Sequence, residues 1–169
     1  MSLSMYQASV PVLLRGLEQL AHILAKGAAH AEAKKIDPSI FVNARLAPDM
    51  LALARQVQIA GDNAKGCVAR LAGAEVPSYA DTETTFPELQ ARVAKTIAFV
   101  KGFTAAQVDG SEDRAIAMKI GGNELKFTGI DYLFKLVLPN FYFHVTTAYD
   151  ILRHNGVELG KPDYLGKIQ

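Results

Sequence analysis

Apolar residues recur every three or four positions in four separate stretches of this chain, and the spacing changes to two in one further stretch. A spacing of three to four places apolar side chains along one side of an α-helix, whereas alternation places them on one face of a β-strand. Four amphipathic helices must bury their apolar sides against one another. The pattern therefore predicts an all-α fold, a four-helix bundle with a small β-hairpin before the last helix.

The first two predicted helices are delimited by prolines and a glycine. The first has its apolar stripe over residues 10–28, with Pro11 expected in the first turn, and it ends before the KKIDPS stretch that contains Pro38. The second spans residues 47–73, with Pro48 in the first turn and the glycine as its stop. The acidic stretch EVPSYADTETTF that follows has irregularly spaced carboxylates, so we expect a solvated loop rather than a calcium site.

The last two predicted helices begin with capping signals. Thr85 precedes the third helix and Glu88 lies three residues on, which is the spacing of a capping box. Thr128 and Asp131 have the same spacing at the start of the fourth helix, although aspartate is a shorter partner. That helix runs to residue 155, and Gly156 is its expected left-handed stop.

The alternating stretch, residues 115–128, predicts the β-hairpin. Ile116 and Met118 alternate on one side of a GGN turn, and Leu125 and Phe127 alternate on the other. A two-stranded hairpin is only marginally stable alone, so it must lie against the helices or against another chain. This requirement is one reason to expect a homodimer.

Size, charge and cysteine content exclude several classes of protein. The chain has 169 residues, of which 50% are hydrophobic, so we expect a single domain over residues 1–169. The net charge is +1 and no basic run alternates with aromatics, which argues against a nucleic-acid partner. No apolar run is long enough for a membrane span or signal peptide. The single cysteine, Cys67, fits a reducing compartment, and we predict a cytoplasmic protein.

The last predicted helix carries the most chemistry, in the stretch PNFYFH. His144 and Asn140 lie one turn apart on its inner, apolar face. Pro139 removes a backbone hydrogen bond and predicts a kink just before this pair. A kink opens space in a bundle, so the two side chains are candidates for a small polar pocket. The alternative is a neutral core imidazole that bonds to Asn140, a tyrosine hydroxyl or a freed carbonyl.

The stretches ARLAPDM, ARLAGAEVP, LPNFYFH and LRHNGVELGKPDYLG, together with the order of the helices, carry a family resemblance. The sequence resembles the DinB-like four-helix-bundle superfamily, and within it an uncharacterised domain-of-unknown-function branch (DUF1993-like). The resemblance covers nearly the whole chain and implies the same bundle fold.

Metal-binding members of that superfamily use three histidines, one on the second helix and two spaced four apart on the last. Mapped onto this sequence, His144 matches the second of the pair and Asn140 stands where the first should be. The second predicted helix has no histidine, and Gln56 or Asp62 is the nearest polar substitute. One imidazole with two amide oxygens is a poor site for zinc or nickel, so we predict no metal site and assign no cofactor.

Two functional hypotheses follow. The first is a homodimeric bundle with a degenerate metal site, which has a structural role or binds a small-molecule ligand. The second, from the resemblance, is a metal- or histidine-dependent enzyme that acts on substrates linked to low-molecular-weight thiols. In that enzyme His144 would be a general base oriented by Asn140.

Overall fold

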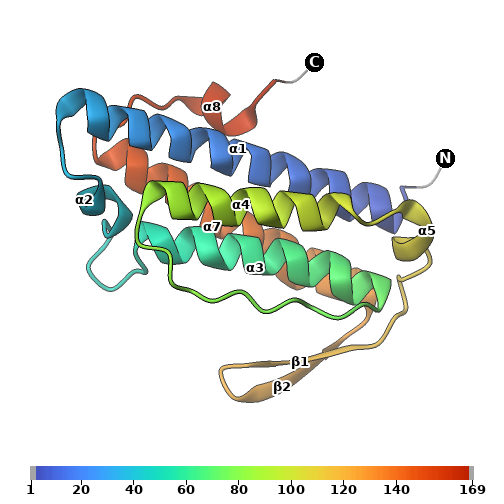
Figure 1. Cartoon of the computed structure of the whole chain (residues 1–169). Coiled ribbons are helices and arrows are strands. Elements are labelled where there is room, and N and C mark those ends of the chain that lie inside the picture. Colours follow the sequence, from blue (N-terminus) through green and yellow to red (C-terminus); the bar gives the residue numbers. More distant parts are fainter. Residues whose placement is uncertain (1–2, 168–169) are drawn as a thin grey trace.

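The computed structural model describes residues 3–167 and contains the predicted helices and hairpin in the predicted order (Figure 1). The long helices are α1 (Met5–Lys34), α3 (Leu53–Ala72), α4 (Phe86–Lys101) and α7 (Leu138–His154). Short helices are α2 (Pro38–Val42), α5 (Ala105–Val108), α6 (Gly129–Asp131) and α8 (Lys161–Leu165), and a π-helical segment, η1 (Tyr132–Val137), precedes α7. The strands are β1 (Ile116–Ile120) and β2 (Asn123–Phe127). The prediction of an all-α bundle with a hairpin before the last helix is confirmed.

The bundle does not have up-down-up-down topology, because α3 and α4 run in the same direction (Figure 1). The connection between them, residues 73–85, must return along the length of α3 before α4 can begin. We call this extended connection the crossover strap. The other two long helices, α1 and α7, run opposite to α3 and α4 and complete the bundle.

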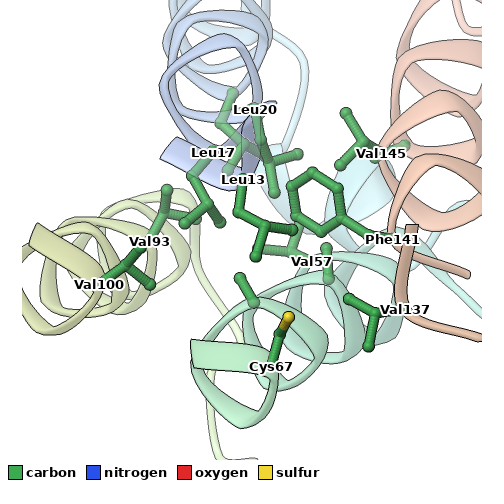
Figure 2. Packing of buried hydrophobic residues seen from close by; sticks show 14 of the residues in the cluster. Leu13, Leu17, Leu20, Val57, Cys67, Val93, Val100, Val137, Phe141 and Val145 are labelled. Atoms are coloured by element: carbon green, nitrogen blue, oxygen red, sulfur yellow. The ribbon is translucent and has the colours of Figure 1, made fainter. Parts of the chain in front are cut away.

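The core lies where the four long helices meet, and the Phe141 ring from α7 occupies its centre (Figure 2). Leu13, Leu17 and Leu20 of α1 approach it from one side, as their three-to-four spacing requires. Gly16 makes this contact close, because a Cβ there would collide with the Phe141 ring.

Helix α1 begins earlier than its apolar stripe indicates. Ser4 caps it: the Ser4 hydroxyl accepts from the Gln7 N–H, and the Gln7 side chain accepts from the Ser4 N–H, both at 3.3 Å. Pro11 therefore lies beyond the first turn, inside the helix, and the expectation that it starts the helix was wrong. The other boundary was predicted to within one residue, since α1 ends at Lys34, the first residue of the KKIDPS stretch.

Helix α3 begins later than predicted, at Leu53. Residues 47–52, which include Pro48, form turns instead of a first helical turn. The Met50 N–H donates to the Ala47 carbonyl, and the Leu53 N–H donates to the Ala44 carbonyl at 2.9 Å. These bonds close the loop that leads into the helix. At its other end the predicted glycine stop is confirmed, with Gly73 at φ +69°.

The last predicted helix is divided into α6, η1 and α7. The Thr128 hydroxyl accepts from the Asp131 N–H at 3.4 Å, as the capping signal predicts, while the Asp131 carboxylate pairs with Lys135. Pro139 is the second residue of α7, directly after the wide π turns. Because proline has no N–H, the regular ladder cannot continue unchanged there. The irregularity that the sequence predicts at Pro139, a kink, thus takes the form of a change from π-helix to α-helix. Gly156, at φ +90°, follows the end of α7 as predicted.

The hairpin is antiparallel and turns at two glycines. Gly121 and Gly122 have φ of 57° and 85°, the positive values of a type I′ turn. Ile116 at its base is buried, and Phe127 packs against Tyr132 with ring centroids 6.1 Å apart. Beyond this base the hairpin extends away from the helices as an arm (Figure 1). None of the helices described is long and apolar enough to cross a membrane.

Candidate functional site

The candidate histidine lies in the seam between α3 and α7. His144 is 8% exposed, and its Nδ1 lies 2.7 Å from Oε1 of Gln56, which is 1% exposed. The sequence left the choice between Gln56 and Asp62 open. The structure places Gln56 opposite His144.

The Gln56 amide fixes the tautomer of the histidine. Its Nε2 donates to the Leu51 carbonyl at 2.9 Å, so its Oε1 faces the imidazole and must accept from the ring. The proton of neutral His144 therefore resides on Nδ1, and Nε2 carries the lone pair. Burial lowers the pKa of His144 below its ordinary value, so the neutral form is favoured.

Asn140 belongs to a second hydrogen bond of the same seam. Its Nδ2 donates to Oδ1 of Asn63 at 3.0 Å, and the Nδ2 of Asn63 donates to the Ile59 carbonyl at 2.9 Å. The sequence pairs Asn140 with His144, but the structure pairs each of them with an amide on α3. Asn63 was missed, although its position seven residues after Gln56 places it on the same helical face.

Asp62 lies on another side of α3, in a charged cluster with α4. Its Oδ1 lies 2.8 Å from Nζ of Lys65 and 3.0 Å from Nη2 of Arg92. The Arg92 side chain is only 2% exposed. Asp62 is thus engaged as a structural ion-pair partner, and of the two alternatives that the sequence left open it is not the one that lies opposite His144.

Arg92 also binds the crossover strap. Its Nη2 lies 2.9 Å from Oδ1 of Asp81, and its Nη1 donates to Oε1 of Glu83 at 3.0 Å and to the Ala80 carbonyl at 2.9 Å. Two residues of α3 hold the same carboxylates, since Arg55 pairs with Asp81 and Gln58 donates to Glu83. The acidic stretch that the sequence indicates as a solvated loop is therefore anchored through its acids.

The electrostatics of this cluster favour its charged state. Burial raises the pKa of Glu83, but hydrogen bonds from Arg92 and Gln58 outweigh it, and the net pKa is lowered. At Asp81 burial is likewise outweighed by Arg55 and Arg92, so that pKa is lowered too. Burial acts to lower the pKa of Arg92, yet the bond from Glu83 and the nearby carboxylates raise it overall. The cluster is an ionised network.

The residues of the α3–α7 seam do not fit the divalent-metal site of the metal-binding relatives. Within residues 3–167 no group of three His, Cys, Asp or Glu side chains is placed to hold a metal ion. The donors that face one another are one imidazole and the side-chain amides of Gln56, Asn63 and Asn140, and each amide is engaged in a hydrogen bond. Neutral amide oxygens are weak ligands for zinc or nickel.

A separate hollow of about 620 Å³ lies between α1 and the segment that carries α8. Its lining includes Arg15, Glu18, Gln19, His22, Pro162, Gly166 and Lys167. The wall is fixed in place, because Asp163 accepts from His22 at 2.9 Å and from Lys26 at 3.0 Å. Two cationic side chains, Arg15 and Lys167, and one carboxylate, Glu18, lie in its lining.

Comparison with known proteins places the chain in a family. A family model described as Domain of unknown function (DUF1993) matches residues 5–165. The chain belongs to this family. The DinB resemblance is also confirmed by a solved structure, a DinB family member protein from Shewanella denitrificans, which is 43% identical. The similarity covers 96% of this chain and 92% of that one, with a TM-score of 0.86. No curated protein matches the sequence.

Membership of the DUF1993 family explains the fold but assigns no reaction. The four-helix arrangement and the hairpin belong to a DinB-like bundle. The seam between α3 and α7 is where the resemblance noted in the sequence would map the three histidines of metal-binding members. In this DUF1993 chain the same seam is filled by side-chain amides and one neutral histidine. Function must therefore be argued from these side chains.

Proposed function

We propose that this chain is a structural or small-molecule-binding homodimer of the DinB-like fold that does not depend on a metal ion. The observation that supports it is the environment of His144. The ring is nearly sealed, its Nδ1 is bound by Gln56, and the position of a second ligand is taken by an amide that bonds to Asn63. A seam packed in this way joins α3 to α7, and it supports the bundle instead of receiving a substrate.

A small-molecule ligand would enter elsewhere, and the hollow between α1 and α8 supports this part of the proposal. A volume of about 620 Å³ is in the range of small-molecule sites. Arg15 and Lys167 in its lining would favour an anionic group on the ligand. Native mass spectrometry of protein purified without a tag would show such a ligand as a mass increment, and Arg15→Ala should reduce its occupancy.

Metal analysis tests the central claim. The wild-type chain and the His144→Ala variant would be produced in medium supplied with nickel, zinc and manganese, and their metal content measured. We expect substoichiometric metal in both proteins. Stoichiometric metal in the wild type that is lost in His144→Ala would overturn the proposal and revive the metal-dependent enzyme.

The second candidate is a histidine-dependent enzyme acting on thiol-linked substrates, and the tautomer of His144 favours it. A neutral ring with its lone pair on Nε2, oriented through Nδ1, is the arrangement that a general base requires. Gln56, rather than Asn140, would be the orienting residue. Conjugation of glutathione to chlorodinitrobenzene measured with wild type and His144→Ala tests it. Equal background rates in both would count against this candidate.

A further inference from the structure

The hairpin has an edge that is free to pair. In residues 3–167 the sheet consists of β1 and β2 alone, so each strand has one neighbour. In a two-residue hairpin the pair next to the turn is hydrogen-bonded, and the bonded pairs then alternate. Met118 opposite Leu125 is therefore a bonded pair, whereas Glu124 opposite Lys119 and Lys126 opposite Ala117 are not. The backbone N–H and C=O groups of Glu124 and Lys126 consequently point away from β1.

The free edge of β2 carries one charge of each sign. Glu124 and Lys126 are two residues apart, so their side chains lie on the same face of the strand, and both are exposed. Leu125 lies between them on the opposite face and is 38% exposed. An exposed strand edge with an apolar residue at its centre is a template for another strand.

The charges select one way in which two copies of this edge can pair. Around a two-fold axis, the outward-facing groups of β2 can meet as Glu124 with Glu124, Lys126 with Lys126, or Glu124 with Lys126. The first two arrangements put like charges directly opposite each other, which is destabilising. The third forms two Glu–Lys pairs and leaves Leu125 on the axis, facing Leu125 of the second copy.

We propose that β2 of one copy pairs antiparallel with β2 of a second copy, with Glu124 opposite Lys126 and Leu125 on the two-fold axis. The two hairpins then form one four-stranded sheet with β2 strands at its centre. This assignment rests on the homodimer in the proposed function and specifies its surface. Pairing through a two-fold axis closes the assembly and leaves no tendency to form fibres through this edge.

The other edge of the hairpin is a poorer partner for itself. The outward-facing residues of β1 are Ala117 and Lys119, because neither belongs to a bonded pair with β2. Self-pairing of β1 can oppose two lysines, two alanines, or an alanine with a lysine, but it cannot form an ion pair. Of the two strand edges of the described hairpin, only that of β2 is self-complementary.

The pairing explains why the hairpin extends from the bundle. Its base is covered, since Ile116 is buried and Phe127 packs on Tyr132, whereas Leu125 further along is exposed. A second hairpin would cover Leu125 and satisfy the outward backbone groups. The surface is small for a permanent interface, so we expect a dimer that dissociates on dilution.

Charge reversal tests the register directly. We would measure the mass in solution of wild type, Glu124→Lys and Lys126→Glu by sedimentation velocity over a series of concentrations. Each variant opposes like charges in every register, so each should be monomeric where the wild type is a dimer. An equimolar mixture of the two variants opposes Lys with Glu throughout, and it should dimerise again.

Lys119→Glu is the matched control. Lys119 lies opposite Glu124 inside the hairpin, so Lys119→Glu opposes two glutamates there, just as Glu124→Lys opposes two lysines. Unlike Glu124→Lys, it leaves the residues of the β2 edge unchanged. We expect this control to remain dimeric. If it dissociates as readily as Glu124→Lys, or if the mixture stays monomeric, the edge assignment is overturned. A wild-type dimer that all variants retain overturns only this assignment, whereas a wild type that is monomeric at every concentration overturns the homodimer as well.

Discussion

Helix α3 supports two polar clusters of opposite character. Toward α4 it contributes to an ionised cluster built around Arg92, and toward α7 it contributes to a neutral seam built around His144. Both central residues are almost fully buried, at 4% and 8% exposure. The charged cluster binds a segment with little apolar surface of its own, the crossover strap. The seam joins two helices that already pack through apolar residues.

The difference between the two clusters indicates that this fold buries charge where a segment has few apolar contacts to hold it. A buried charge is costly unless it is paired and hydrogen-bonded, and Arg92 reaches the carboxylates of Asp62, Asp81 and Glu83. Those contacts hold the strap in an extended course that few apolar contacts could fix. In the seam, neutral amides satisfy His144 with no buried charge at all. The two clusters should therefore respond differently when one member is removed.

The largest effect is expected for Arg92→Met. It leaves three carboxylates without their common partner, and because Asp62 and Asp81 are partly exposed we expect the lower end of the usual range, a loss of about 3 kcal/mol. Urea denaturation at neutral pH would measure this, with Lys101→Met as the control, since Lys101 is 56% exposed and pairs with an exposed Glu18. Equal stability of both variants would remove the distinction between the cluster and a surface ion pair.

Gln56→Leu should have the next largest effect. It leaves the Nδ1–H of His144 without an acceptor and the Leu51 carbonyl without its donor, at a cost of about 1–3 kcal/mol. Thermal and urea unfolding would measure it. A more stable variant would show that the seam is retained at the expense of stability, and it would strengthen the enzyme candidate over the structural one.

Asn140→Leu should cost less than Gln56→Leu. Its partner Asn63 is only partly buried and keeps a second bond to the Ile59 carbonyl, so we expect a loss of about 1 kcal/mol or less. The same unfolding experiments compare the two variants within one seam. A loss as large as that of Gln56→Leu would mean that Asn140 and His144 act as one unit.

The smallest effect concerns pH. The pKa of His144 is lowered from its ordinary 6.5, so the unfolded chain binds the proton more readily than the folded chain. Stability from this ring is therefore complete above 6.5 and falls as the pH drops below it. The lowered pKa values of Asp81 and Glu83 stabilise the fold above their ordinary 3.8 and 4.5, and this is lost only in more acidic solution.

Measurements of unfolding free energy between about pH 7 and 5 isolate the seam from the charged cluster. Wild type should lose stability over this range, and His144→Gln should show a shallower slope. Arg92→Met should keep the wild-type slope. A slope that disappears in Arg92→Met instead would assign the titration to the cluster.

The sequence predicted the elements that depend on local signals. Thr85 and Glu88 form their capping box, Gly73 ends its helix in the left-handed conformation, and the hairpin turns at its glycines. These features involve residues at most a few positions apart, so periodicity and capping chemistry are enough to find them. The start of α3 was placed too early because Pro48 fits a turn as well as a first helical turn.

The partners across the bundle were not predictable in the same way. His144 was a candidate because of its place on an apolar face, yet whether Gln56 or Asp62 faces it depends on how α3 is rotated. The role of Arg92 was missed altogether, since Asp62 lies 30 residues away on another helix. Its other two carboxylate partners, Asp81 and Glu83, meet it only because the strap returns along α3. Contacts of this kind are decided by topology, and no local pattern encodes them.

The π-helical segment η1 also determines the direction of the arm. A π turn contains one residue more than an α turn, and it lies directly between the hairpin and α7. Deleting one residue there would restore an ordinary α-helix while α7 stayed packed on α3. Everything upstream, including β2, would then rotate by about 100° around the helix axis. Because Tyr132 and Leu133 of this segment are buried in the core, the same deletion would turn them away from it, so the direction of the arm is coupled to the packing of the core.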